Sequence, residues 1–167
     1  MRNRVLLLAL VLLVSAPGYS QSGVGDSASV GIAQKTGAES SLDVQEAALR
    51  YRIKTWTILS EVDCVIIEGK EAPPSFLARF KGTPVRPAAE CEKQGLEGLP
   101  PSIYVIVDKQ TKKHSTIFLI GAVRFLGPTD AEAVVSYEGG SQLKASDRYK
   151  LQLHGNVWSV VDVELLP

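Results

Sequence analysis

The stretch RYKLQLHGNVWSVVDVEL, residues 148–165, decides the fold class of this chain. In its first half Tyr149, Leu151 and Leu153 alternate with polar residues, a period of two that is typical of a half-buried β-strand. Only the dipeptide Gly155–Asn156 separates this run from the next, so the stretch predicts two antiparallel strands joined by a tight hairpin. In the second strand we expect one face to carry Val157, Ser159, Val161, Val163 and Leu165.

Two further strands are predicted immediately before this hairpin. Ala131–Glu138 alternates apolar and polar residues, and the turn-forming run Gly127–Asp130 separates it from Ser115–Phe125. Within the earlier strand, Ile117–Val123 (IFLIGAV) is apolar on both faces, which predicts a central strand covered by a helix on one side and by a loop or partner on the other. Gly121 within this run predicts a bend or a bulge. Together the four strands predict one curved antiparallel β-sheet.

A long helix is predicted ahead of the sheet. Residues 44–59 contain no Gly or Pro, and Asp43 with Glu46 three positions later resembles a capping box that would start the helix. At about 100° per residue the sequence gives two apolar bands on this helix. We expect the band that faces the sheet to consist of Leu42, Leu49, Ile53 and Trp56.

Shorter elements are predicted between the helix and the four strands. Asp63–Glu68 is a short β-rich run, Ser75–Phe80 a short helix that opens near proline, and Val85–Cys91 an extended segment that Pro87 keeps at an edge. Ile103–Asp108 and His114–Phe125 flank a polar turn, so we expect them to pair as a hairpin.

The size and composition of the chain suit one domain. It has 167 residues, of which 45% are hydrophobic and 22% charged, which is enough for one core and too few for two domains. We expect residues 42–167 to form a single α+β domain and the Ser- and Gly-rich residues 21–41 to form a flexible linker.

The first 20 residues have the order of a secretory signal peptide. Arg2 and Arg4 precede the unbroken apolar run Val5–Val14, and small residues follow as far as Ser20. A membrane anchor is the alternative, but a transmembrane helix needs about 20 apolar residues and this run is much shorter. We therefore expect a secreted or periplasmic protein with no membrane span after cleavage of residues 1–20.

The charge of the chain gives no reason to expect nucleic acid as a partner. Loss of residues 1–20 would remove two arginines and no acidic residue from the 18 of each sign, leaving a formal net charge of −2. The only basic cluster, Lys109 with Lys112, Lys113 and His114, is interpreted as a solvated turn, with an anion-binding site as the alternative.

Cys64 and Cys91 are the only cysteines. In an exported chain an even pair predicts a disulfide, with a metal or catalytic site as the alternative. His114 and His154 fall near separate predicted turns, and no metal-binding, serine-nucleophile or nucleotide-binding motif is present. The sequence therefore predicts no catalytic residue, no cofactor and no metal.

Four stretches carry a resemblance to a known fold: ALRYRIKTW (48–56), DCVIIEGKEAPPSFLARF (63–80), VRPAAEC (85–91) and NVWSVVDV (156–163). In these the chain resembles the cystatin-like α+β roll, within it the nuclear-transport-factor-2-like superfamily, and there a group of secreted bacterial proteins of unknown function. The resemblance covers residues 42–167. It implies a long N-terminal helix packed on a curved antiparallel β-sheet, with an apolar cone between them.

The resemblance also implies where a site would lie. Known members of that superfamily include steroid isomerases and small-molecule dehydratases, which set Asp, Tyr or His groups in the cone. The side chains here that could supply such groups, and so line a pocket, are Tyr51, Asp63, Tyr104 and Tyr137. Cystatin protease inhibitors share the broader roll, but their Q-x-V-x-G hairpin is absent.

Two functions follow as hypotheses. The first is a non-enzymatic exported module that binds a small apolar ligand or a protein partner in the cone, because no catalytic constellation is visible. The alternative is a cavity enzyme of isomerase or dehydratase type with an acid–base residue in the cone. A homodimer formed through the sheet stays open as a further partner.

Overall fold

The computed structural model describes residues 37–55 and 60–167, all within the unit formed by residues 34–167. The predicted signal peptide, residues 1–20, and the predicted sheet-facing Trp56 lie outside the described residues. The helices are α1 (Gly37–Thr55) and α2 (Pro74–Leu77), with the 3₁₀ turns η1 (Ala78–Phe80) and η2 (Ala88–Glu90). The strands are β1 (Val62–Ile67), β2 (Lys70–Glu71), β3 (Val85–Pro87), β4 (Cys91–Gly95), β5 (Tyr104–Asp108), β6 (Ser115–Ile120), β7 (Arg124–Phe125), β8 (Asp130–Gly140), β9 (Leu143–His154) and β10 (Val157–Leu166).

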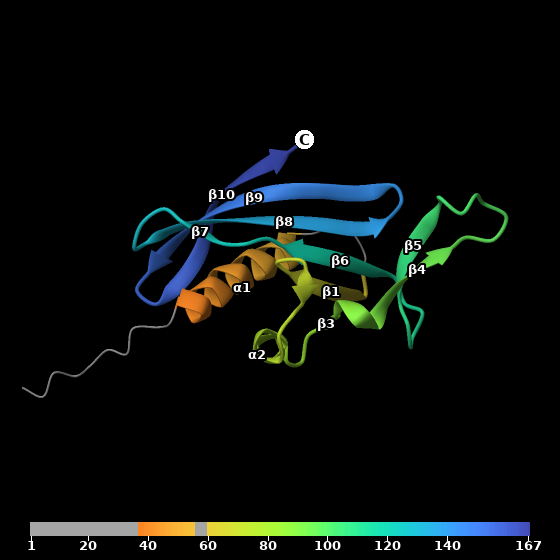
Figure 1. Cartoon of the computed structure of the whole chain (residues 1–167), viewed down its shortest axis with the longest axis horizontal. Coiled ribbons are helices and arrows are strands. Elements are labelled where there is room, and N and C mark those ends of the chain that lie inside the picture. Colours follow the sequence, from red (N-terminus) through yellow and green to blue (C-terminus); the bar gives the residue numbers. More distant parts are fainter. Residues whose placement is uncertain (1–36, 56–59) are drawn as a thin grey trace, which may run out of the picture. The chain divides into compact units, whose positions relative to one another are not determined.

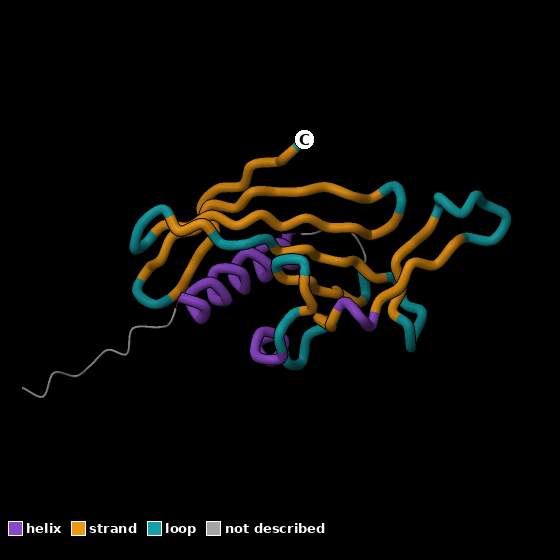
Figure 2. The backbone as a smooth tube through the Cα atoms, viewed as in Figure 1, coloured by secondary structure: helices purple, strands orange, loops and turns teal. Residues whose placement is uncertain are grey.

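These strands form one mostly antiparallel sheet, and α1 lies against one face of it (Figure 1). The main order is β10-β9-β8-β6-β1-β2, and the short strands β3, β4, β5 and β7 pair beside this path. The sheet curls like part of a barrel, and Figure 2 shows the three long strands β8, β9 and β10 running side by side. The predicted antiparallel run β6-β8-β9-β10 is confirmed, and so is the hairpin at Gly155–Asn156, where Val157 lies opposite His154. The chain is therefore α+β, with a curved, antiparallel-rich sheet.

The first strands pair differently from the prediction. β1 runs parallel to β6, with Val62 opposite Ser115 and Ile67 opposite Ile120, and β3 is also parallel to β1. The expected hairpin between β5 and β6 forms only at its turn, where Val107 and His114 make an antiparallel bridge. Along its length β5 pairs with β4 instead. Parallel strands are usually covered on both faces, which agrees with the near-continuous apolar sequences of β1 and β6.

Helix α1 begins earlier than expected and presents a different face. It starts at Gly37, and Asp43, instead of capping it, accepts a hydrogen bond from Arg79 Nη1 at 2.7 Å. The most buried described side chains of the helix are Val44, Gln45, Ala48 and Leu49. Of the predicted sheet-facing band, Leu49 is fully buried, whereas Leu42 and Ile53 are only partly buried against the core, so the prediction was right in part. The most buried face of the helix therefore lies between the two predicted bands.

The space between α1 and the sheet is filled by large side chains. Leu49, Phe118 and Tyr149 each have no exposed surface, and Phe76 from α2 closes the same core. A second, smaller cluster of Val62, Cys64, Cys91 and Ile106 covers the opposite face of β1. The burial of Phe118 in the first cluster and the packing of Ile117 against the second agree with a central β6, although Leu119 is exposed.

Two irregularities shape the long strands. β6 ends at Ile120, and the Gly121 N–H still donates to Val134 O at 2.8 Å. One extra residue then lies between this contact and the pairing of Arg124 with Glu132 in β7, which is a bulge. In β10 the register shifts between Val160 and Asp162, so one extra residue moves the later side chains to the other face. Trp158, Val160 and Val163 therefore pack on the core. Of the face predicted for this strand, Val163 alone packs on the core, whereas Val157, Ser159, Val161 and Leu165 are exposed.

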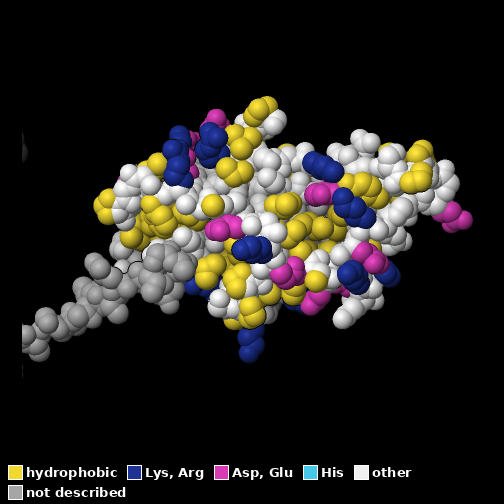
Figure 3. Space-filling view, viewed as in Figure 1, with side chains coloured by type: hydrophobic (Ala, Val, Ile, Leu, Met, Phe, Trp, Pro, Cys, Tyr) yellow, Lys and Arg dark blue, Asp and Glu magenta, His cyan; other side chains and the backbone are white. Residues whose placement is uncertain are grey.

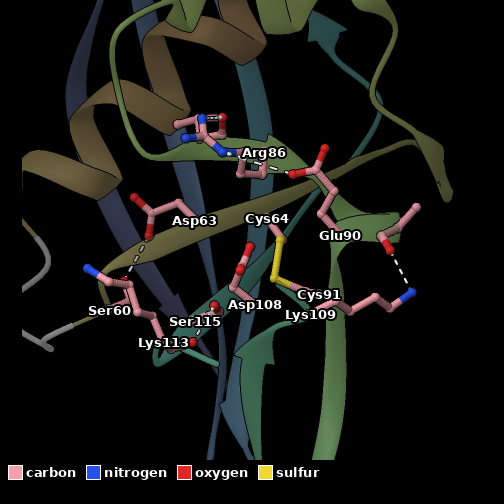
Figure 4. Close-up of a disulfide and its surroundings, with 12 residues drawn as sticks. Ser60, Asp63, Cys64, Arg86, Glu90, Cys91, Asp108, Lys109, Lys113 and Ser115 are labelled. Carbon is pink, nitrogen blue, oxygen red and sulfur yellow. Dashed lines mark hydrogen bonds and ion pairs between the residues drawn. A yellow bond between two sulfur atoms is a disulfide. The ribbon is translucent and has the colours of Figure 1, made fainter. Parts of the chain in front are cut away.

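The predicted disulfide is confirmed. Cys64 of β1 and Cys91 at the start of β4 are joined with an S–S distance of 2.07 Å and a Cα–Cα distance of 6.3 Å (Figure 4). Both cysteines belong to the smaller cluster and are almost completely buried. The bond therefore fastens the β4–β5 hairpin to the centre of the sheet.

Replacing Cys64 and Cys91 together by Ala should lower the free energy of unfolding by about 2–5 kcal/mol. The bond closes a loop with a sequence separation of 27, for which loss of unfolded-state entropy alone predicts about 3.5 kcal/mol. Denaturant unfolding of the double variant beside the oxidised wild type measures this difference. A loss below about 1 kcal/mol would show that the hairpin is held without the bond.

Candidate functional site

A small apolar cleft lies beside the C-terminal half of α1. It has a volume of about 180 Å³, and the side chains that form it include Arg50, Ile53, Lys54, Asp63, Phe80 and Val85. Helix α1 supplies one wall, β1 the floor, and the segment from η1 to β3 the other wall. The cleft is open to solvent and its surface is mostly apolar.

The local sequence explains how the far wall forms. Pro73 and Pro74 open α2, and the chain leaves η1 through a turn in which Gly82 has a φ of 84°. Thr83 donates from its N–H and from its hydroxyl to Phe80 O, which holds this turn closed. β3 then pairs with β1 so that Val85 lies opposite Asp63. Phe80, Val85 and Asp63 are thereby brought to one place from three segments.

Asp63 is the one buried acidic side chain in this cleft. It is 4% exposed, and its Oδ1 accepts a hydrogen bond from Ser60 Oγ at 2.8 Å. Figure 4 shows Asp63 and Cys64 leaving β1 in different directions, as neighbouring strand residues must. Among the described residues no Lys or Arg forms an ion pair with Asp63. Burial raises the pKa of the Asp63 carboxyl above its ordinary value, and the hydrogen bond from Ser60 offsets part of that rise.

Two basic side chains stand at the mouth of the cleft. The Arg50 guanidinium lies 4.4 Å from the ring centroid of Phe80, pairs with Glu46 at 2.8 Å and donates to Arg79 O. Lys54 is exposed, and no carboxylate pairs with it in the described part of the chain. The cleft thus combines apolar walls, a buried carboxyl group and an ammonium group at the rim that a ligand can reach.

A buried polar cluster lies nearby, where α1 crosses β8 and β9. Arg52 Nη1 is 3.0 Å from Asp147 Oδ2, and the Tyr149 hydroxyl donates to the same oxygen at 3.1 Å. The Arg52 guanidinium stacks 4.2 Å from the ring centroid of Tyr137, and Tyr51 meets Tyr149 edge to face at 5.8 Å. Burial raises the pKa of Tyr149, so its hydroxyl stays protonated and donates. This cluster joins the helix to the sheet.

The four residues predicted to line a pocket lie in three places. Tyr51, which is 38% exposed, contacts Tyr149 at the border of the buried polar cluster, and Tyr137 stacks against Arg52 of that cluster. Asp63 forms the floor of the cleft. Tyr104 lies on β5, where its hydroxyl donates to Glu138 at 2.5 Å and Lys93 stands 4.6 Å from its ring centroid. The pairing of β5 with β4 rather than β6 accounts for this separation. Asp63 alone among the four lines the cleft.

The sequence prediction missed Arg52, Asp147 and Tyr149 as a unit. Asp147 precedes Tyr149 by two positions, so both must point to the same face of β9. That face was predicted to be the core face, and a carboxyl group on it requires a buried partner. The helix was oriented incorrectly, which hid Arg52 as that partner.

Several charged groups elsewhere on the surface are matched by opposite charges. A groove of about 450 Å³ on the outer side of the sheet includes Arg124, Glu132 and Arg148 in its lining. Arg124 pairs with Glu132, and Arg148 pairs with Glu164 at 2.8 Å. In the basic cluster predicted to be a solvated turn, Lys112 pairs with Glu92 and Lys113 with Glu61, while Lys109 donates to Ala89 O. Figure 3 shows blue and magenta side chains adjoining over one face of the molecule.

Over residues 37–55 and 60–167 no three His, Cys, Asp or Glu side chains gather as a metal site would require. Within the same residues no helix is both long enough and apolar enough to cross a membrane. Comparison of the chain with protein-family models, with curated proteins and with solved structures found no match.

Replacing Asp63 by Asn should stabilise the protein more at pH 7 than at pH 3. The pKa of Asp63 is raised on folding, so its favourable contribution is present below the unfolded pKa and is lost as the pH rises through the folded pKa. Asn keeps the acceptor for Ser60 and never ionises. Urea unfolding of both proteins at the two pH values measures this change in unfolding free energy. A change of the same size at pH 7 and at pH 3 would contradict a raised pKa for Asp63.

Replacing Arg52 by Met should cost about 3–5 kcal/mol of unfolding free energy, because it leaves the Asp147 carboxylate buried without its cation. Lys54→Met is the matched control on the same helix, and we expect a change within about 0.5 kcal/mol there. Denaturant unfolding of both variants tests this. Similar small effects in both would show that the Arg52–Asp147 pair does not hold the helix on the sheet.

Proposed function

We propose that this chain is an exported, non-enzymatic binding module that receives one apolar side chain of a protein partner in the cleft above Asp63. The filled space between α1 and the sheet is the observation that carries this proposal. Leu49, Phe118 and Tyr149 occupy the place where a cavity enzyme of the expected type would hold its substrate. The cleft at the side of α1 is the apolar hollow that remains available to a partner.

The size of the cleft favours a side chain over a free small molecule. Pockets that enclose small-molecule ligands usually measure about 300–1,000 Å³. The cleft measures about 180 Å³ and is open on one side. An apolar side chain carried by a partner fits such a hollow, and the rest of the partner would rest on the surrounding surface.

The rim adds a preference for charge. Lys54 stands at the mouth with no carboxylate paired to it among the described residues, whereas Arg50 is already held by Glu46. An acidic group next to the inserted side chain would pair with Lys54 without breaking an existing ion pair. We therefore expect the partner segment to combine one apolar residue with a neighbouring carboxylate.

A cavity enzyme of isomerase or dehydratase type is the second candidate, and Asp63 is the observation in its favour. Its carboxyl group is buried in an apolar cleft and its pKa is raised, as is common for a general acid or base. Against this candidate, the described side chain that bonds Asp63 is a serine, and no His or second carboxyl group lines the cleft with it. Catalysis by this route would make turnover depend on Asp63.

We also propose that the fold is a variant of the cystatin-like roll of the nuclear-transport-factor-2-like superfamily, and that the protein is secreted or periplasmic. A long helix on a curled antiparallel sheet supports the first proposal. The parallel pairing of β1 with β3 and β6 departs from the fully antiparallel sheet that the resemblance implies. The Cys64–Cys91 bond supports an oxidising compartment.

Titration of the protein with N-acetyl-leucinamide, followed by ¹H–¹⁵N NMR, tests the binding function. We expect saturable shifts at Ile53, Thr83 and Val85, with a dissociation constant in the millimolar range that is about ten times lower for N-acetyl-leucinamide than for N-acetyl-alaninamide. Lys54→Trp should abolish the shifts by filling the mouth of the cleft. Lys70→Trp, an equally exposed substitution on β2, should leave them unchanged.

Shifts that do not saturate, or that survive Lys54→Trp, would remove the cleft as the binding site. The enzyme candidate is tested with the same samples. If the wild type turns over a substrate and Asp63→Asn lowers kcat at least about a hundredfold while remaining folded, the cavity enzyme replaces the binding module.

A further inference from the structure

Strand β10 forms a long free edge of the sheet. It extends over ten residues, and its backbone bonds β9 on one side, whereas on the other side no described segment pairs with it. Figure 1 shows this strand at the border of the sheet. Such an edge presents a row of N–H and C=O groups that can pair with another strand.

The side chains of β10 give this edge an apolar character. Val157, Val161 and Leu165 are 66%, 51% and 79% exposed. In Figure 3 hydrophobic side chains reach the surface at the upper border, where Figure 1 places the end of β10. The strand holds no Lys and no Pro, the residues that commonly protect free edges from pairing.

The acidic residues of β10 do not protect the edge either. Asp162 pairs with Lys150 at 2.8 Å and Glu164 pairs with Arg148 at 2.8 Å, both across the β9–β10 pair. Their charges are therefore neutralised within one copy of the chain. The remaining irregularity is the shift of register at Val161, which interrupts the edge without covering it.

We propose that β10 pairs antiparallel with β10 of a second copy of this chain, so that the two sheets become one continuous sheet. A two-fold axis perpendicular to the sheet keeps the core-facing side of both copies on the same side. With Val160 opposite its own counterpart, and Val161 left out as the bulged residue, Trp158 faces Val163 and Ser159 faces Asp162. In this register the core-facing pairs are apolar, and no two like charges stand directly opposite one another.

This inference is independent of the cleft, because none of the residues of β10 lines it. The dimer would leave Asp63 and Lys54 open to a partner in both copies. If the protein proves to be a monomer, the proposed binding function is unaffected. If the cleft binds no ligand, the proposed dimer is unaffected.

Light scattering on the eluting protein, over a range of concentrations, tests the inference. We expect a mass of two chains that falls to one on dilution. Val161→Lys should raise the dissociation constant of the dimer at least about tenfold, because a lysine at the bulge lies beside the paired residues Val160 and Asp162 and must lose water when the two edges meet. Val161→Thr, which keeps the shape and the β-propensity, and Leu99→Lys, an exposed control in the loop after β4, should change it less than about threefold.

Amide hydrogen exchange separates edge pairing from any other dimer. Amides of β10 should exchange more slowly as protein concentration rises, while amides of the short strand β2 should not respond. A single-chain mass at all concentrations up to about 1 mM would overturn the proposal, and so would a dimer whose β10 amides exchange at a rate independent of concentration.

Discussion

Strand β1 is the element on which the rest of the structure depends. It is bonded to β2, β3 and β6, and its side chains alternate between two different environments. Val65 and Ile67 belong to the core beneath α1, while Cys64 points to the other side and bonds Cys91. Asp63, on the side of the helix, forms the floor of the cleft. A shift of one residue in the pairing of β1 would exchange these faces and remove both the disulfide and the cleft.

The position of α1 follows from the same strand and from the buried polar cluster. Arg79 binds Asp43 and Glu46, which ties the segment after β2 to the helix. Farther along α1, Arg52 binds Asp147 on β9. A buried ion pair of this kind adds little net stability, but it fixes which face of the helix meets the sheet. Both attachments hold α1 in place, and α1 forms one wall of the cleft.

The sequence predicted the parts of the fold that depend on local pattern. The alternation of apolar and polar residues and the turn residues located β8, β9 and β10. The disulfide was predicted because Cys64 and Cys91 are a single pair in a chain expected to be exported. The bulge at Val161 reversed the predicted face of the residues before it, because a pattern of alternating residues does not show where one extra residue is inserted. The parallel pairing of β1 with β6 joins residues more than 50 positions apart, and no local signal encodes it. Among the predicted pocket residues Asp63 lines the cleft. Tyr104 lies away from the cleft because β5 pairs with β4.

Binding of a polypeptide in the cleft above Asp63, without catalysis, is the proposal on which the suggested function rests. Native mass spectrometry of the protein recovered from its own medium or envelope fraction, beside Lys54→Trp treated identically, tests it most directly. We expect the wild type to form a non-covalent complex with a second, different polypeptide, and we expect the variant to lack this complex. A retained small molecule that is converted to product, or a complex that survives in Lys54→Trp, would contradict the claim.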